Sequence, residues 1–169
     1  MIFPKTTISE IIGLLEVIND AGGKEDVAQI AADFNLELDE LLPSIDAAEL
    51  FEFVVVTNGD IKLTGDAQKL LDSDIRERKH IIKDKVANVK IIKELKNKLI
   101  ESEDHTMDKE DALKLLQKRI STINIESYFN VIINWARYVG LFCYNSDSEE
   151  ICLISNERET GNLRLIFIP

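Results

Sequence analysis

The chain has 169 residues, 45% of them hydrophobic and 30% charged, and 31 acidic against 20 basic side chains give a net charge of −11. This balance argues against a protein that coats nucleic acid or lies on an anionic membrane, because both surfaces would repel it. Only seven glycines and three prolines exclude the collagen-like and low-complexity classes. The longest apolar runs, such as 53–56, fall far short of the roughly 20 residues of a transmembrane helix.

The N-terminal residues carry no secretory signal, and two cysteines do not make a disulfide scaffold. We therefore expect a cytoplasmic protein.

The first 63 residues predict three helices, over about 9–21, 25–34 and 39–51, and then a hairpin over 53–63 that turns at Asn58-Gly59. Thr7 or Ser9 can cap the first helix, and Gly22-Gly23 can end it. Three helices followed by a hairpin is the order of a winged helix-turn-helix. The residues expected to face inward on the second and third helices are Val27, Ile30, Ala31, Phe34, Leu41, Leu42, Ile45, Ala48 and Leu50.

The rest of the chain predicts a short helix over 64–71 and one long helix over 74–101, whose apolar residues fall mostly three, four or seven apart. A polar loop follows over 101–106. Two more helices, over 108–120 and 125–139, precede a second hairpin over 141–154.

The second half of the chain repeats the pattern of the first. A shift of 88 residues brings Ala48 onto Ala136 and the run 53–56 onto 141–144, and the second hairpin loop then needs two extra residues. The prediction is a mainly α fold with two small β-hairpins, built as tandem winged-helix units joined by a long helix. The expected parts are a first winged-helix unit at 7–72, the long connecting helix at 73–104, the rest of the second winged-helix unit at 105–155, and a C-terminal tail at 156–169.

Several segments then point to a known family. They read IGLLE at 12–16, GGKED at 22–26, LELDELLP at 36–43, AAEL at 47–50, LT at 63–64, DIRERK at 74–79 and WARY at 135–138. In these segments the sequence resembles the AAA-associated C-terminal domain of ATP-binding subunits in nitrate/sulfonate/taurine-type ABC importers, over roughly residues 7–153. The resemblance implies a regulatory or oligomerising accessory module without an active site. Glu52 stands where the family pattern usually has glycine, so we expect mild strain there.

Catalytic and metal-binding patterns are not found in the sequence. There is no glycine-rich phosphate loop ending in Lys-Ser/Thr, and His80 and His105 suggest no catalytic order. Cys143 and Cys152 can face each other across the second hairpin; we interpret them as small buried residues in a reducing compartment, with a redox pair or a metal site as alternatives. We expect no cofactor, no metal and no enzymatic activity.

Acidic residues cluster near the start of the third helix, at Glu37, Asp39 and Glu40. Carboxylates at this place favour the helix dipole, so we interpret them as capping residues, with an acid–base or cation site as the alternative.

Protein partners fit the composition better than nucleic acid does. The third helix carries four acids and no base, whereas DNA readers need arginine or lysine for phosphates and base edges. We therefore expect a non-catalytic regulatory module that binds a protein partner, such as an ABC transporter ATPase or permease. The alternative is a winged-helix DNA-binding transcription regulator, and a third reading is a small-ligand sensor with a pocket between the units.

Two segments are candidate interfaces. Trp135, Tyr138 and Phe142 form the densest aromatic region, which is either the core of the second unit or, in part, an exposed anchor for a partner. The tail around Leu165 and Phe167 is apolar and β-prone, and such a segment needs cover from its own domain or from a second copy. The tail therefore suggests a homodimer.

Overall fold

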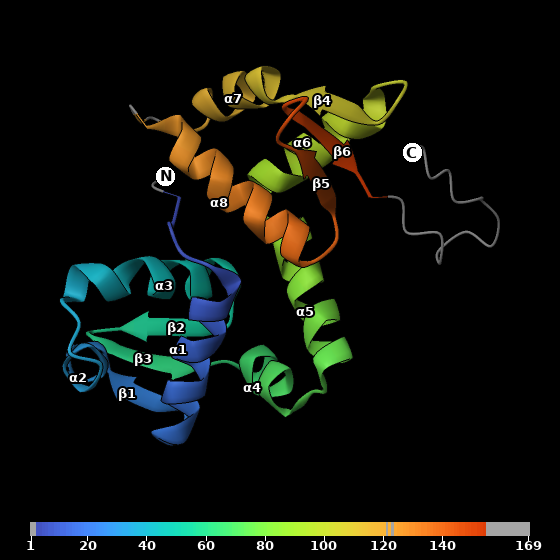
Figure 1. Ribbon diagram of the computed structural model, residues 1–169. Helices are drawn as coiled ribbons and strands as arrows, with labels where there is room; N and C mark the ends of the chain where they lie inside the picture. The colour runs from blue at the N-terminus through green and yellow to red at the C-terminus, as the bar shows by residue number, and fades with distance from the viewer. Residues whose placement is uncertain (1–2, 121, 123, 155–169) are drawn as a thin grey trace.

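A computed structural model describes residues 3–120, 122 and 124–154 of the chain. Within this part the protein is mainly helical, with eight helices and two three-stranded antiparallel sheets, which confirms the predicted class. Figure 1 shows the first sheet in the lower part of the view and the second sheet in the upper part, with α8 and α5 between them.

The first unit contains α1 (Ile8–Asp20), β1 (Lys24–Asp26), α2 (Val27–Asp33), α3 (Leu38–Leu50), β2 (Val54–Thr57) and β3 (Asp60–Leu63). Its strand order is β1-β3-β2. Thr7 caps α1 as predicted: its hydroxyl accepts from the Glu10 N–H at 3.2 Å, and the Glu10 carboxylate accepts from the Thr7 N–H at 2.7 Å. Asp26 caps α2 without such reciprocity: its carboxylate accepts from the N–H groups of Ala28 and Gln29.

The chain then passes through α4 (Gly65–Asp72) and α5 (Ile75–Asn88) into the second unit. This unit contains α6 (Lys90–Glu101), β4 (Thr106–Asp108), α7 (Lys109–Gln117), α8 (Ile125–Tyr138), β5 (Phe142–Asn145) and β6 (Glu150–Leu153). Its strand order, β4-β6-β5, repeats the order of the first sheet.

The expectation of one continuous helix within 73–104 is wrong. Val89 has an extended conformation, with φ −60° and ψ 124°, and it separates α5 from α6. The apolar pattern runs unbroken through Val86, Val89 and Ile92, all of them buried, because both helices pack against the core. The break lets α6 pack against β4, β6 and α7, so that it takes in the second unit the place that α1 has in the first.

Two short strands were not expected from the sequence. Residues 25–26 begin the predicted second helix, and residues 106–108 span the end of a predicted loop and the start of a predicted helix. In the structure β1 pairs with β3, Lys24 lying opposite Lys62, and β4 pairs with β6, Thr106 lying opposite Cys152. Each strand adds a third member to a predicted hairpin.

The strand registers show the internal repeat directly. Val55 lies opposite Lys62 in the first sheet, and Cys143 lies opposite Cys152 in the second. The shift is therefore 88 residues on the first strand of each hairpin and 90 on the second, which confirms the two extra residues in the second loop.

Backbone hydrogen bonds repeat as well. Leu63 donates to the Gly23 carbonyl in the first unit, and Leu153 donates to the His105 carbonyl in the second, both at 3.0 Å. Gly23 and His105 both have positive φ, 88° and 57°. The two units thus turn at the same point by the same backbone geometry.

Glu52 and Gly140 occupy the matching turn after the third helix of each unit. Both have positive φ, 59° and 68°, and the next residue in each case donates back into the helix, from Phe53 to Ala48 and from Leu141 to Ala136. A non-glycine residue in this region is strained. The strain expected at Glu52 is therefore present, and Gly140 supplies the residue type that the turn favours.

Trp135 joins the two units. It is fully buried on α8, and its indole N–H donates to the Thr6 carbonyl at 2.8 Å. Its ring centroid lies 5.0 Å from that of Phe3 and 4.9 Å from that of Phe51, both in the first unit. The cores of the two units therefore form one continuous apolar cluster.

Gly140→Ala should lower the free energy of unfolding by about 1 kcal/mol, because the positive φ is costly for any residue with a Cβ. No atom lies within 4 Å of the added Cβ, so backbone strain is the whole effect. Gly13→Ala is the matched control: it lies within α1, also in open space, and should stabilise by about 0.5–1 kcal/mol. Urea unfolding of both variants would test whether their free energies of unfolding change in opposite directions.

Trp135→Phe should destabilise by about 2–3 kcal/mol, because it leaves the buried Thr6 carbonyl without its donor and opens space between the units. Tyr138→Phe, three residues further along the same helix and 43% exposed, is the control and should change the stability by less than about 0.5 kcal/mol. Equal midpoints of thermal unfolding for the two variants would contradict the role given to Trp135.

Candidate functional site

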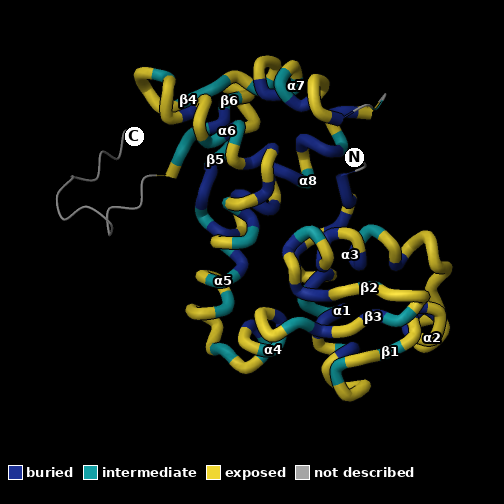
Figure 2. The backbone as a smooth tube through the Cα atoms, turned by 180° about the vertical axis from the view of Figure 1, so that it is seen from behind, coloured by how far each residue is buried: buried dark blue, intermediate teal, exposed yellow. Residues whose placement is uncertain are grey.

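A patch of exposed apolar side chains lies at the turn between α2 and α3. Four of the nine exposed large hydrophobic side chains of the described residues fall within 34–42, and Phe34 is the most exposed of these four at 48%. The chain is exposed without interruption over residues 32–40, as Figure 2 shows. The four side chains, which we call the α2–α3 patch, are Phe34, Leu36, Leu38 and Leu42.

The prediction that Phe34 and Leu42 face inward is wrong. Helix α2 ends at Asp33 and Phe34 is its C-cap; the chain turns away directly afterwards, at Asn35 with a positive φ of 53°, so the buried face of α2 stops short of Phe34. Leu42 lies on the outer face of α3, next to the buried Leu41. Contiguous exposed apolar surface of this kind marks interaction sites in soluble proteins.

An acidic groove runs beside the patch and contains two of its members. It lies between α1, the α2–α3 connection and α3, and its volume is about 680 Å³. Carboxylates alone supply the charge of its lining, with no lysine or arginine among the lining residues. We define the acidic groove by Leu14, Val17, Phe34, Leu36 and Leu41 in its apolar wall and by Glu10, Glu16, Asp20 and Glu40 at its edges.

Two of the four carboxylates also cap helices. Glu10 accepts from the Thr7 N–H, which is the main cause that lowers the pKa of its carboxyl, and from the hydroxyls of Thr6 and Thr7. Glu40 accepts from the Glu37 N–H at 2.9 Å, so the capping interpretation of this acidic cluster is confirmed for Glu40. Glu16 lies 3.4 Å from the Arg78 guanidinium. The groove keeps an excess of negative charge.

The outer surfaces of the third helix and hairpin of each unit are also mostly acidic. In the first unit α3 contains no base, and Asp46 and Glu49 are exposed on it. In the second unit Arg137 is the single base of α8, and Asp147 and Glu149 are exposed at the hairpin turn.

The described residues contain no group of three or more His, Cys, Asp or Glu side chains placed to hold a metal ion. The His80 ring nitrogen lies 3.8 Å from the Asp84 carboxylate on the exposed side of α5, and His105 Nδ1 lies 3.1 Å from the Leu99 carbonyl.

Cys143 and Cys152 face each other across β5 and β6, as predicted. Their Cα atoms are 5.0 Å apart, and the two sulfur atoms form a disulfide. The structure thus differs from the interpretation as unlinked thiols, because the register places the two residues directly opposite each other.

The predicted interface residues occupy different environments. Trp135 and Phe142 are fully buried, where they serve the protein's own core. Tyr138 is exposed on α8 and stays a candidate contact residue. Leu165 and Phe167, in the apolar tail, lie outside the described residues.

Comparison with protein families decides what kind of domain this is. The family model of the C-terminal AAA-associated domain matches residues 28–145, from α2 into the last residue of β5. The chain belongs to this family. The match covers 118 of 169 residues, counted as 145 − 28 + 1, and includes most of both units of this AAA-associated domain.

The AAA-associated C-terminal domain is an accessory domain rather than a catalytic one. No curated protein and no solved structure is significantly similar to the chain. In the part of the chain that the structure describes, no helix combines the length and the apolar character needed to cross a membrane.

Glu10→Gln should lower the free energy of unfolding of this AAA-associated domain by about 0.5–1 kcal/mol at pH 7, because the charged carboxylate caps α1. The pKa of Glu10 is lowered by folding, so its stabilising effect is present at neutral pH and is lost as the pH falls through the folded-state pKa. The difference between variant and wild type should therefore shrink on acidification to about pH 3. Urea unfolding at both pH values measures this difference. Glu103→Gln, at an exposed position, is the control and should leave the free energy of unfolding unchanged at both pH values.

Proposed function

We propose that this AAA-associated domain is a non-catalytic regulatory module that binds a protein partner through the acidic groove and the α2–α3 patch. The observation that carries the proposal is the gathering of exposed apolar side chains beside a groove whose charged groups are all carboxylates. An accessory domain acts on other proteins through such surfaces, and the family membership supports this role.

The partner we propose is an ATP-binding subunit or permease of a nitrate/sulfonate/taurine-type ABC importer, in the cytoplasm. The support is the resemblance of segments such as 36–43 and 74–79 to the accessory domains of those ATPases. The acidic groove adds a chemical requirement: the bound segment of the partner carries lysine or arginine around one or two large apolar side chains. Opposite charges would guide the encounter, and apolar burial would supply most of the affinity.

We also infer that the two units are winged-helix units. The support is the shared order of helix, strand, helix, helix and hairpin, with the third strand paired to the hairpin in each sheet. The second and third helices of the first unit then form the helix-turn-helix, and the α2–α3 patch lies at its turn.

DNA binding, the alternative for such units, is not favoured by the charges. The exposed face of α3 carries Asp46 and Glu49 where a recognition helix needs bases for phosphates and base edges. The other exposed side chains of α3 are the apolar Leu38 and Leu42 and the acidic Asp39 and Glu40. A protein surface is a better match for this mixture than a duplex is.

The test is affinity capture with the complete chain from a nuclease-treated lysate of cells that express it naturally, read by mass spectrometry. Recovery of an ABC ATPase or permease, at the same level with and without nuclease, is the expected result. Recovery of transcription proteins that disappears on nuclease treatment would contradict the proposal and favour DNA binding.

Phe34→Asp and Leu38→Asp should each weaken binding of the captured partner at least tenfold, because each places a charge at the centre of the apolar contact. Both side chains are exposed, so folding should be unchanged by circular dichroism. The matched control is Ile100→Asp, since Ile100 is an apolar side chain on α6 that is 50% exposed and distant in sequence from the patch. Titration by biolayer interferometry would measure all three, and equal losses for the control and the patch variants would contradict the site.

A further inference from the structure

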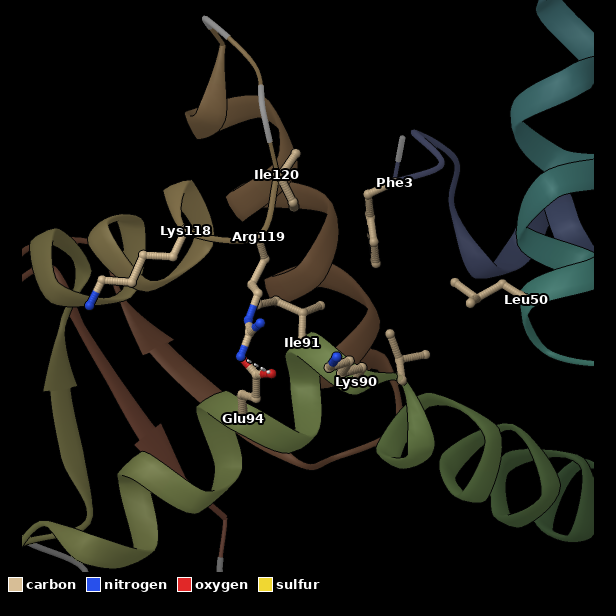
Figure 3. A pocket seen from close by; sticks show the side chains of 9 residues that line it. Phe3, Leu50, Lys90, Ile91, Glu94, Lys118, Arg119 and Ile120 are labelled. Atoms are coloured by element: carbon tan, nitrogen blue, oxygen red, sulfur yellow. Dashed lines mark hydrogen bonds and ion pairs between the residues drawn. The ribbon is translucent and has the colours of Figure 1, made fainter. Parts of the chain in front are cut away.

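A cavity lies at the junction of the two units, on a different side of the first unit from the acidic groove, with which it shares no lining residue. Its volume is about 370 Å³, within the range of small-molecule sites. Figure 3 shows the N-terminal segment, the end of α3, the start of α6 and the connection after α7 meeting around it.

The walls of the cavity are apolar and come from both units. Phe3 and Leu50 belong to the first unit, and Ile91 and Ile120 belong to the second; Val89, at the break between α5 and α6, completes the wall. Four of these five side chains are buried, and Leu50 is half-buried. A ligand in this cavity would displace water from the apolar walls that both units contribute, which favours binding.

The charged residues at the cavity are mostly basic, in contrast to the rest of a chain of net charge −11. They are Lys90, Lys118 and Arg119 against one acid, Glu94. Arg119 and Glu94 neutralise each other through two contacts of 3.0 Å, drawn as dashed lines in Figure 3. Among the described residues, no carboxylate forms an ion pair with Lys90 or Lys118.

Lys90 is the cation best placed to serve the cavity. Its side chain is exposed, and Figure 3 shows it end-on beside Ile91 at the start of α6, whereas Lys118 points away from the centre of the cavity. Lys90 is also the first residue of α6, whose preceding residue, Val89, offers no side-chain cap. The partial positive charge of this helix start adds to that of the lysine.

We propose that the junction cavity binds a small amphipathic carboxylate, with its hydrocarbon chain between Phe3, Leu50 and Ile120 and its carboxylate at Lys90. The complementarity of charge selects an anion, and the apolar walls select one with a hydrocarbon tail. Because the walls come from both units, the ligand stabilises their association, and the module senses a metabolite through the junction. The proposal goes beyond the protein-binding function and does not depend on it.

Trp135 provides a fluorescent reporter for the test. It is the single tryptophan of the chain, and its ring lies 5.0 Å from that of Phe3, a wall of the cavity. The complete chain would be titrated with sodium octanoate while tryptophan emission is recorded, and the same titration would be followed by ¹⁵N–¹H correlation spectra. We expect a saturable change in emission, with amide shifts centred on residues 89–91 and 118–120.

Octanol carries the same hydrocarbon tail as octanoate but has no charge, and octylamine carries that tail with a positive charge. They should bind at least about tenfold more weakly than octanoate, since a charged hydrogen bond is lost or replaced by repulsion. Lys90→Gln should weaken octanoate about tenfold and leave octanol unchanged. Lys93→Gln, an exposed lysine three residues further along α6 that is absent from the cavity lining, is the control and should leave octanoate binding unchanged.

Several results would overturn the proposal. They are the absence of a saturable response to octanoate in both readouts, equal affinity for octanoate and octylamine, and amide shifts centred on the acidic groove in place of the junction. The partner-capture experiment is independent of each of these results.

Discussion

The contact that Trp135 makes with the first unit is the constraint on which the rest of the structure depends. One side chain satisfies the Thr6 carbonyl and packs against Phe3 and Phe51, so it fixes α8 against the N-terminal segment and the end of α3. Thr6 is itself held by hydrogen bonds of its hydroxyl with Ser44 and Glu10. The capping of α1, the seating of α3 and the docking of the second unit are thus coupled through a few atoms of residue 6.

The protein has two apolar surfaces of different character, one at the junction of the units and one at the α2–α3 patch. The junction around Trp135 is apolar, buried and bordered by bases, whereas the turn between α2 and α3 is apolar, exposed and bordered by acids. The proposed ligand site and the proposed partner site therefore differ in their chemistry. In this molecule α3 connects them, with Leu42 near its start at the patch and Leu50 at its end in the cavity.

Much of the fold can be predicted from the sequence, because the elements that carry strong local patterns form where expected. The Thr7 cap, the Asn58-Gly59 turn and the shift of 88 residues are local or repetitive features, and the structure bears them out. The strands β1 and β4 have three residues each and no apolar alternation, so only pairing with a distant strand reveals them. The break at Val89 interrupts no apolar period and contains neither glycine nor proline, so it follows from tertiary packing alone.

The candidate site was harder to predict for a related reason. Phe34 continues the apolar period of α2, and its exposure depends on the helix ending one residue earlier, at a turn that Asn35 makes with a positive φ. The acids of the groove come from α1 and α3, which are distant in sequence. Helical periodicity identifies a buried face well, but it does not show where that face stops or which two helices will border a groove.

The repeat also shows how unequally the two units contribute to the contact between them. The shift of 88 residues places Ala47 at the position equivalent to Trp135. Ala47 is buried, and its methyl side chain is too small to reach the other unit. The two units therefore meet through a side chain that only the second unit carries, and their junction is asymmetric although their strand orders match.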